Sequence, residues 1–263
     1  MSANDSAKNN DSFFNTIIVA TVLCLVCSLM VAGSAISLKS DQQRNKAADV
    51  QKSILLASGL VKAGEQADFD QLFADNIETK IIDIASGEFV EGIDLAKFDQ
   101  RKAANNPATN KELSQQEDIA SIKRRAKQAK VYLVKDGDNL KSVILPIKGY
   151  GLYSMLYGFI ALEADTKTVS GLKFYEHGET PGLGAEIENP KWIATWIGKE
   201  VYDNNYSPAI KLVKTGANTK SEVDALSGAS MTSRGVENLL TYWLGNDGFG
   251  PFLAKVRGGN HGV

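Results

Sequence analysis

The chain has 263 residues, of which 43% are hydrophobic and 23% are charged, and its formal net charge is -2. This composition excludes a disordered polypeptide and allows one sizeable hydrophobic core. Because basic residues are not in excess, nucleic acid is excluded as a partner, and small molecules and membrane proteins remain as partner classes.

An uncharged apolar segment follows a short N-terminal tail at 1–11. Residues 12–38 contain no Asp, Glu, Lys or Arg, and a helix over them would be about 40 Å long, enough to cross a hydrocarbon core of about 30 Å. The alternative is a cleaved signal peptide, since Lys8 precedes the segment and Gly33-Ser-Ala35 resembles a cleavage site. The apolar region of a signal peptide has only about 7–15 residues, so the sequence predicts a transmembrane helix at 12–38.

The charges that flank this segment do not decide its orientation. More basic residues follow it than precede it, which by itself favours a cytoplasmic location for the C-terminal side. Large domains, however, cross membranes largely regardless of such charges. The basic residues that follow the segment are Lys39, Arg44 and Lys46.

Both cysteines, Cys24 and Cys27, lie inside the apolar segment. The rest of the chain can therefore hold neither a disulfide nor a cysteine metal site. On one turn of a helix the two residues are either small packing residues or thiolate ligands of a metal shared with a partner. Packing is the simpler interpretation, and no metal site is predicted elsewhere.

Residues 39–129 are expected to form a stalk and a lead-in to the main domain. The spacing of Val50, Ile54 and Leu55 indicates an amphipathic helix. The turn pair Ser86-Gly87 lies between alternating apolar residues and indicates a hairpin. The expected elements are helices at 47–61 and around 69–73, a hairpin at 80–90, a polar loop at 105–116, and a charged helix at 117–130 that exposes Lys123-Arg-Arg125.

Residues 130–257 are expected to form the core domain, ahead of a tail at 258–263. Turn residues such as Asp136-Gly137 separate runs of β-branched and aromatic residues. Four strands in a row predict a mainly antiparallel sheet, and the helices that flank it make the fold α+β. The expected strands are 131–134, 142–147, 157–162, 169–175 and a short one at 210–213, and the expected helices are 190–199 and 236–244.

Two glycine-marked loops leave this sheet, and glycine allows a backbone to approach a ligand closely. Either loop could be a simple turn, and neither matches a Walker A or dinucleotide-binding pattern. The second loop combines an acidic residue, a hydroxyl and a Pro-Gly pair, which suit a flat ligand with polar edges. The first loop consists of Gly149, Tyr150, Gly151, Leu152 and Tyr153, and the second contains Glu179, Thr180, Pro181, Gly182, Leu183 and Gly184.

A third segment, residues 224–233, gathers hydroxyls and small residues just ahead of the predicted helix at 236–244. The free N–H groups and the positive dipole end of a helix start bind anions such as phosphate. A serine hydrolase centred on Ser230 is the alternative, but the G-x-S-x-G pattern fails at its last position and nothing in the sequence orients His177 as a base. The segment therefore predicts a phosphate site whose hydroxyls are Ser227, Ser230, Thr232 and Ser233.

The sequence Asp224-x-x-Ser-Gly-Ala-Ser230 resembles the flavinylation motif of FMN-binding domains, in which a flavin transferase attaches FMN through its phosphate to the last hydroxyl. Both glycine loops are similar to this family. The N-terminal span and Gly248-Phe-Gly-Pro-Phe252 extend the resemblance over nearly the whole chain. Within the family, the chain resembles the FMN-carrying subunits of sodium-translocating NADH:quinone oxidoreductases.

The resemblance implies a subunit of a bacterial inner-membrane complex that relays electrons through covalent FMN. It implies a single membrane span, a periplasmic domain, other membrane subunits and a flavin transferase as partners, and no acid–base catalyst. Ser230 stands where the family usually has Thr, so Thr232 remains the alternative acceptor, and Asp224 is implied to help the transferase recognise the site. The implied contacts with FMN are Ser227, Gly228, Ala229, Ser230, Thr232 and the residues of both glycine loops.

A covalent bond agrees with the energetics of such a site. A helix start stabilises an anion by about 0.3–1 kcal/mol, which is too little to retain a cofactor, whereas a covalent bond removes dissociation altogether. Two other functions remain possible at this point. They are the equivalent FMN subunit of the related ferredoxin:NAD oxidoreductase complex, and a non-redox anchor module that binds a phosphate ligand reversibly.

Overall fold

The computed structural model describes residues 13–62, 64–137 and 139–259, and the chain divides into two compact units, residues 1–48 and 49–263. The predicted tail at 1–11, Ser12 and residues 260–263 lie outside the described residues. Helix α1 (Phe13–Ser58) contributes to both units. It is the one helix in the described part of the chain that is long and apolar enough to cross a membrane, a property that signal sequences share.

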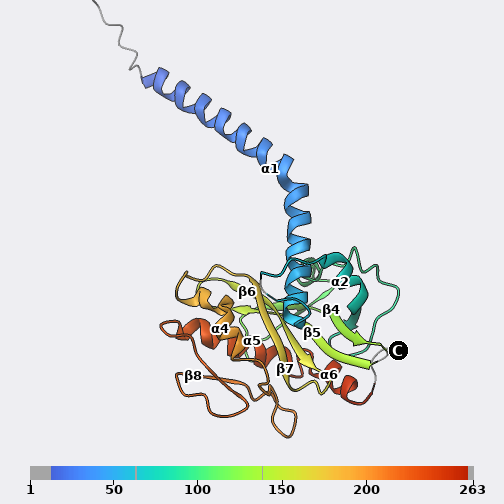
Figure 1. Ribbon diagram of the computed structural model, residues 1–263. Coiled ribbons are helices and arrows are strands. Elements are labelled where there is room, and N and C mark those ends of the chain that lie inside the picture. Colours follow the sequence, from blue (N-terminus) through green and yellow to red (C-terminus); the bar gives the residue numbers. More distant parts are fainter. Residues whose placement is uncertain (1–12, 63, 138, 260–263) are drawn as a thin grey trace, which may run out of the picture. The chain divides into compact units, whose positions relative to one another are not determined.

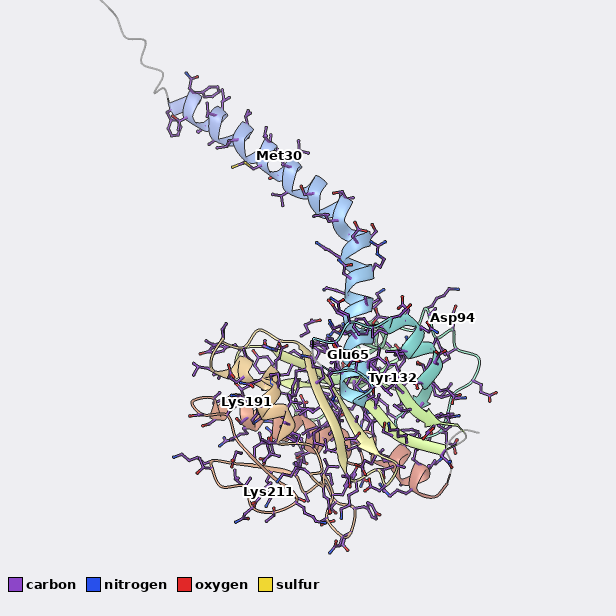
Figure 2. The ribbon with its side chains drawn as sticks, in the orientation of Figure 1. Met30, Glu65, Asp94, Tyr132, Lys191 and Lys211 are labelled. Atoms are coloured by element: carbon purple, nitrogen blue, oxygen red, sulfur yellow. The ribbon has the colours of Figure 1, made fainter. Side chains whose placement is uncertain are left out.

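The apolar part of α1 is exposed along its length in the described residues. None of its most hydrophobic 18-residue stretch is buried, and exposed side chains such as Met30 point away from the helix axis in Figure 2. The helix then continues without a break through the stalk helix expected at 47–61 and ends just before Gly59, which has a φ of 72°. Residues 39–46 contain neither Gly nor Pro, so nothing in them interrupts the helix.

The second unit is built on a five-stranded antiparallel sheet with the strand order β1-β4-β5-β6-β7 (Figure 1). The four strands predicted in a row are present, and the α+β class is confirmed. The sheet begins before residue 130, because β1 lies in the predicted lead-in and pairs with β4. The strands are β1 (Ile77–Asp83), β4 (Gln128–Asp136), β5 (Asn139–Tyr150), β6 (Met155–Glu163) and β7 (Val169–Glu176).

Alternate residues of each strand face opposite layers, as the two-residue period of a strand requires. One face contributes Tyr132, Ile144 and Phe159 to a cluster with the end of α1 and with α2 (Phe69–Asn76). The other face packs against α5 (Ser230–Leu244), α6 (Gly250–Arg257) and the segment that includes α4 (Pro190–Ala194). The sheet is therefore covered on both faces, and α5, which starts at the predicted phosphate site, is held by the larger core.

The predicted charged helix at 117–130 is wrong. Asp118 accepts hydrogen bonds from the backbone N–H groups of Ile122 and Lys123, each at 2.7 Å, and Lys123 has a φ of 61°, so this stretch is a chain of turns. It is followed by β3 (Arg124–Ala126) and by the start of β4. Arg125, expected to be solvated, is only 3% exposed. Its charge suggested a surface helix, but its guanidinium is buried as well and donates to the Ala126 carbonyl at 3.0 Å.

The remaining elements are short. The predicted hairpin at 80–90 is reduced to a bridge between Ile82 and Phe89, and the helix predicted at 190–199 ends with α4 at Ala194. Several elements were not predicted, including a strand within the expected loop at 105–116. Strand β8 (Lys211–Val213) agrees with the short strand predicted at 210–213. The other short elements are α3 (Gln100–Asn105), β2 (Asn110–Glu112), η1 (Gly184–Glu188) and β9 (Glu222–Asp224).

Candidate functional site

The start of α5 offers a group of free backbone donors. The helix begins at Ser230, and no side chain caps it. Gly228 has a φ of 73°, a conformation that suits glycine and turns the preceding loop onto the helix axis. Free N–H groups at the start of a helix form an anion site. Within the described part of the chain, no hydrogen bond is made by the N–H groups of Ser227, Gly228, Ser230, Met231 and Thr232.

The four hydroxyls of this segment fall into two classes. Ser233 is 2% exposed, and its hydroxyl is hydrogen bonded to the backbone of the preceding loop on two sides. Thr232 is 1% exposed and donates to the Glu179 carboxylate at 2.6 Å. Ser227 and Ser230 are exposed. Only these last two hydroxyls are accessible to an enzyme that acts on the folded chain.

Glu179 joins the second glycine loop to the other two segments. Its Oε1 accepts from the N–H groups of Tyr153 at 3.0 Å, Leu152 at 3.1 Å and Ser154 at 3.2 Å, while Oε2 accepts from Thr232. Burial raises the pKa of this carboxyl, but the hydrogen bonds outweigh burial and hold the pKa below its ordinary value. The carboxylate is therefore an ionised junction between the two loops and α5.

The second glycine loop turns tightly and reaches the phosphate-site segment. The Thr180 carbonyl accepts from the N–H groups of Leu183 and Ala185, both at 3.1 Å. Pro181 and Gly182 are exposed at its tip. A methyl group placed on Gly228 would lie 3.1 Å from the Leu183 side chain, so the two segments are in contact. All three segments singled out in the sequence therefore meet.

The end of β5 packs directly on α5 through Gly235, a residue outside the motifs identified in the sequence. A methyl group on Gly235 would lie 2.5 Å from the Tyr150 carbonyl oxygen and 2.9 Å from Gly151 Cα. Gly149 and Tyr150 are the last residues of β5, and Gly149 lies against the Leu239 side chain of α5. The role of Gly149 is therefore to let α5 approach β5 closely. Gly235 lies one helical turn after Met231, and that spacing was the only signal in the sequence.

Large apolar side chains are exposed on all three segments. They come from both loops and from the first turn of α5, and a flat aromatic ligand could lie against them. They are Tyr150 (44% exposed), Leu152 (39%), Tyr153 (65%), Leu183 (45%) and Met231 (52%). A phosphate at the helix start and a ring against these side chains together fit the two ends of FMN.

Other residues singled out in the sequence lie around this site without entering it. Asp224 ends β9, and its carboxylate accepts from the Ala217 N–H at 2.8 Å, so it orders the loop that precedes the site. His177 is oriented after all, with Nε2 3.3 Å from Glu188, but its Nδ1 already accepts from the Glu179 N–H. No contact between His177 and Ser230 occurs in the described structure, so a hydrolytic Ser–His pair is not formed.

The described residues contain no group of three or more His, Cys, Asp or Glu side chains that could hold a metal ion. Cys24 and Cys27 are free thiols exposed on α1.

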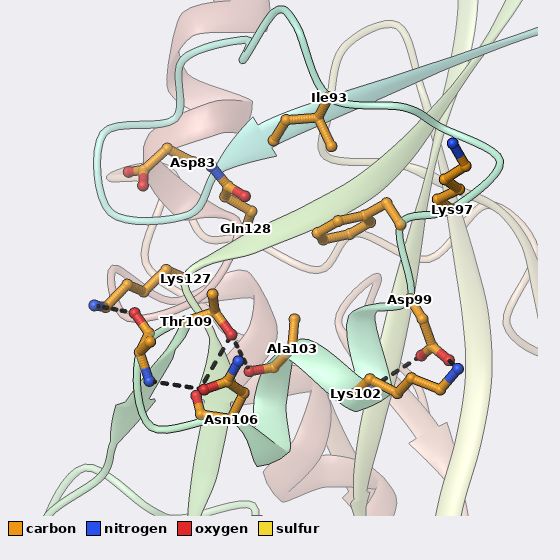
Figure 3. A pocket seen from close by; sticks show the side chains of 12 residues that line it. Asp83, Ile93, Lys97, Asp99, Lys102, Ala103, Asn106, Thr109, Lys127 and Gln128 are labelled. Carbon is orange, nitrogen blue, oxygen red and sulfur yellow. Dashed lines mark hydrogen bonds and ion pairs between the residues drawn. The ribbon is translucent and has the colours of Figure 1, made fainter.

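A surface pocket of about 520 Å³ lies elsewhere in the second unit (Figure 3). Ile93, Phe98 and Ala103 contribute apolar surface to it, and Lys97 and Lys102 each pair with a nearby aspartate. None of its lining residues belongs to the candidate site. The candidate site is consequently assembled from exposed segments and does not depend on this concavity.

Known proteins resemble the chain over nearly its whole length. A Vibrio parahaemolyticus protein, named as the C subunit of the Na(+)-translocating NADH-quinone reductase, is 49% identical over 259 residues, 96% of this chain and 98% of that protein. The chain belongs to this family, the NqrC family. A Pseudomonas aeruginosa protein with the same name is 47% identical over 95% of this chain and 98% of its own length. Residues 151–245 match the FMN-binding domain family. This range includes the second glycine loop, the segment 224–233 and the first glycine loop from Gly151 to Tyr153.

Solved structures of the NqrC family share the fold. The crystal structure of Shewanella oneidensis NqrC aligns with a TM-score of 0.77 at 38% identity, and covers 82% of this chain and 99% of that chain. The corresponding protein from Parabacteroides distasonis aligns with a TM-score of 0.63 at 27% identity, and covers 82% and 96%. The resemblance carried by the flavinylation motif and the glycine loops is thereby confirmed at the level of the family.

Proposed function

We propose that the chain is the FMN-carrying subunit of a sodium-translocating NADH:quinone oxidoreductase and that it holds FMN through a phosphoester on Ser230. One observation carries the choice of Ser230. Its hydroxyl is exposed at the first residue of α5, beside backbone N–H groups that have no acceptor in the described structure. Thr232, the alternative acceptor, is buried and already donates to Glu179.

The residues of the site divide the binding of FMN between them. The N–H groups at the helix start stabilise the phosphate, and the exposed side chains of Leu152, Tyr153 and Leu183 offer a surface to the ring. Because one helix start contributes only about 0.3–1 kcal/mol, a covalent bond is what retains the cofactor. Bound FMN supplies electron transfer, and the protein supplies attachment and orientation.

Attachment needs an activated donor. Condensation of free FMN with a hydroxyl would have to expel water, so the flavin transferase must use FMN held in a phosphoanhydride. The Ser230 oxygen forms the new P–O bond, the anhydride P–O bond breaks and the other phosphate group of the anhydride leaves, and the hydroxyl proton passes to a base on the transferase. Asp224, exposed at the end of β9, is available to that enzyme as part of the recognition motif.

The remaining parts of the proposal concern the membrane. We propose that α1 is an uncleaved single-pass anchor in a bacterial inner membrane, that the domain from residue 49 lies in the periplasm, and that other subunits of the complex are its electron donor and acceptor. The apolar, uncharged first part of α1 supports the anchor. The names of the bacterial relatives support the complex.

Two measurements on the full-length chain, co-expressed with a flavin transferase, test the attachment. The wild-type band on a denaturing gel is expected to fluoresce under ultraviolet light, Ser230→Ala is expected to be dark, and Ser207→Ala, which removes an exposed hydroxyl outside the motif, serves as the control. A dark wild-type band refutes covalent FMN.

Mass mapping then tests the position, since trypsin cleavage after Lys220 and Arg234 isolates residues 221–234, which contain the four candidate hydroxyls and Ser221. An adduct mapped to Ser227 or Thr232 refutes Ser230 as the acceptor.

A further inference from the structure

The Glu179 carboxylate is directed at donors of the protein itself. It is 5% exposed, and its Oε1 accepts from the backbone N–H groups of Leu152, Tyr153 and Ser154 and from the Ser154 hydroxyl. Its Oε2 accepts from Thr232 at 2.6 Å and from the Leu152 N–H at 3.3 Å. Although the loop sequence placed Glu179 among the flavin contacts, its oxygens are turned inward to the protein.

Two groups of N–H donors therefore lie near each other with different acceptors. The N–H groups of Leu152 to Ser154 receive the protein's own carboxylate, whereas those at the start of α5 stay free. The Thr232–Glu179 bond, 2.6 Å long, connects the two groups. The positive end of the helix dipole also favours a carboxylate at the first turn of α5.

The end of the second glycine loop packs against the same hydrogen bond. A methyl group on Gly184 would lie 2.7 Å from Glu179 Oε2 and 2.7 Å from Thr232 Oγ1, so the loop ends directly against both atoms. The exposed side chains of Leu152, Tyr153 and Leu183 each belong to, or directly adjoin, a residue that this junction fixes. One buried side chain thus sets the positions of the apolar surface and of the helix start together.

We propose that Glu179 is a positioning residue that assembles the flavin surface before FMN is attached, by binding the 152–154 turn and the first turn of α5 to the 180–184 loop. The proposal rests on the proposed function for its purpose, but the assembly it describes does not require flavin. Its consequence is that the loops are ordered in the unmodified chain and that the attached ring meets a preformed surface.

Hydrogen–deuterium exchange on the full-length chain in detergent tests the assembly without flavin. In a Ser230→Ala background, Glu179→Gln is expected to speed exchange of the Leu152, Tyr153 and Ser154 amides by about tenfold or more, because a neutral amide oxygen accepts hydrogen bonds more weakly than a carboxylate oxygen. Thr232→Val is expected to act in the same direction, with Thr232→Ser restoring protection. Exchange at these amides within about twofold of the parent refutes the proposal.

Asp165 provides a matched control. Its carboxylate accepts from the N–H groups of Lys167 and Thr168, each at 2.8 Å, and from the Thr168 hydroxyl at 2.6 Å, in the turn between β6 and β7. Asp165→Asn removes the same kind of carboxylate from a turn outside the site. It is expected to leave exchange at residues 152–154 unchanged, and equal acceleration by both variants would show a general loss of stability and overturn the positioning role.

The flavin-loaded chain gives a second readout. Glu179→Gln is expected to lower the fluorescence anisotropy of the attached flavin, because the ring loses a fixed surface, while Asp165→Asn keeps the wild-type value. Unchanged anisotropy in Glu179→Gln refutes the link to the cofactor. If wild type carries no covalent flavin, the proposed function fails, and the exchange experiment still decides the assembly by itself.

Discussion

The contact between Gly235 and the end of β5 allows a quantitative test of how the site is held together. Gly235→Ala places a methyl group 2.5 Å from the Tyr150 carbonyl oxygen and 2.9 Å from Gly151 Cα. Both distances are well inside the contact distance of about 3.5 Å, and both partners are backbone atoms that cannot rotate away. The helix must therefore move away from the strand at the point where the first loop begins.

The expected cost follows from two opposing effects. Overpacking of this kind costs about 1–3 kcal/mol, and the better helix propensity of Ala returns about 1 kcal/mol. The net destabilisation is about 0–2 kcal/mol. With a urea dependence of about 2 kcal/mol per molar, the unfolding midpoint should fall by up to about 1 M.

Tryptophan fluorescence is a suitable probe for this measurement. The chain's three tryptophans, Trp192, Trp196 and Trp243, are all buried in the domain, and none lies in the apolar segment. Full-length chain in detergent can therefore be titrated with urea while only the domain is observed. Asn238→Ala on the same helix is the control, since it gains propensity without a backbone contact, and its midpoint should rise slightly. If Gly235→Ala also raises the midpoint, the close approach of α5 to β5 is wrong.

Three further outcomes are expected. Tyr202→Phe removes the hydrogen bond that the tyrosine hydroxyl donates to the Leu244 carbonyl at 2.6 Å, so the free energy of unfolding should fall by about 1–2 kcal/mol. Tyr206→Phe, at an exposed position, is the control and should change the free energy of unfolding little. Equal effects of the two variants would contradict the role of this bond. The folded-state pKa of Glu179 is lowered, so its contribution to stability is complete above the unfolded pKa of about 4.3 and is lost as pH falls through the folded pKa. Glu179→Gln should therefore make the loss of stability at acid pH less steep. An unchanged slope at acid pH would argue against an ionised carboxylate. Trypsin added to spheroplasts should degrade the domain and leave a membrane-bound fragment that contains α1, whereas protection in spheroplasts and cleavage in inverted vesicles would place the domain in the cytoplasm.

The sequence predicted the central part of this fold because strand patterns there are regular. Runs such as Val131–Val134 and Tyr157–Leu162 alternate or are continuously apolar between clear turns, and both are strands. The prediction of a helix at 117–130 was wrong because the charges of this stretch suggested a solvated helix. Its conformation is set by hydrogen bonds that the Asp118 carboxylate accepts from the backbone. Short elements such as β2 were missed because three residues carry no periodicity.

The candidate site was predictable in its membership and not in its internal order. The motif and the loops identified the three segments from sequence alone. That Ser230 is exposed while Thr232 is buried depends on which side of α5 faces Glu179, and this in turn depends on packing against β5 through Gly235. Such a tertiary relation leaves no mark on spacing along the chain. The inward orientation of the Glu179 carboxylate could not be found from the sequence for the same reason.

The sorting of the hydroxyls around α5 has a consequence for when the chain can be modified. An unfolded chain would present Ser227, Ser230, Thr232 and Ser233 alike, within a few residues of one another. The folded domain conceals the last two, so folding itself narrows the choice of acceptor before any enzyme arrives. A chain that fails to bury Thr232 against Glu179 would expose more than one hydroxyl to the transferase. If attachment follows folding, the chains modified at a single position would therefore be enriched in correctly folded molecules.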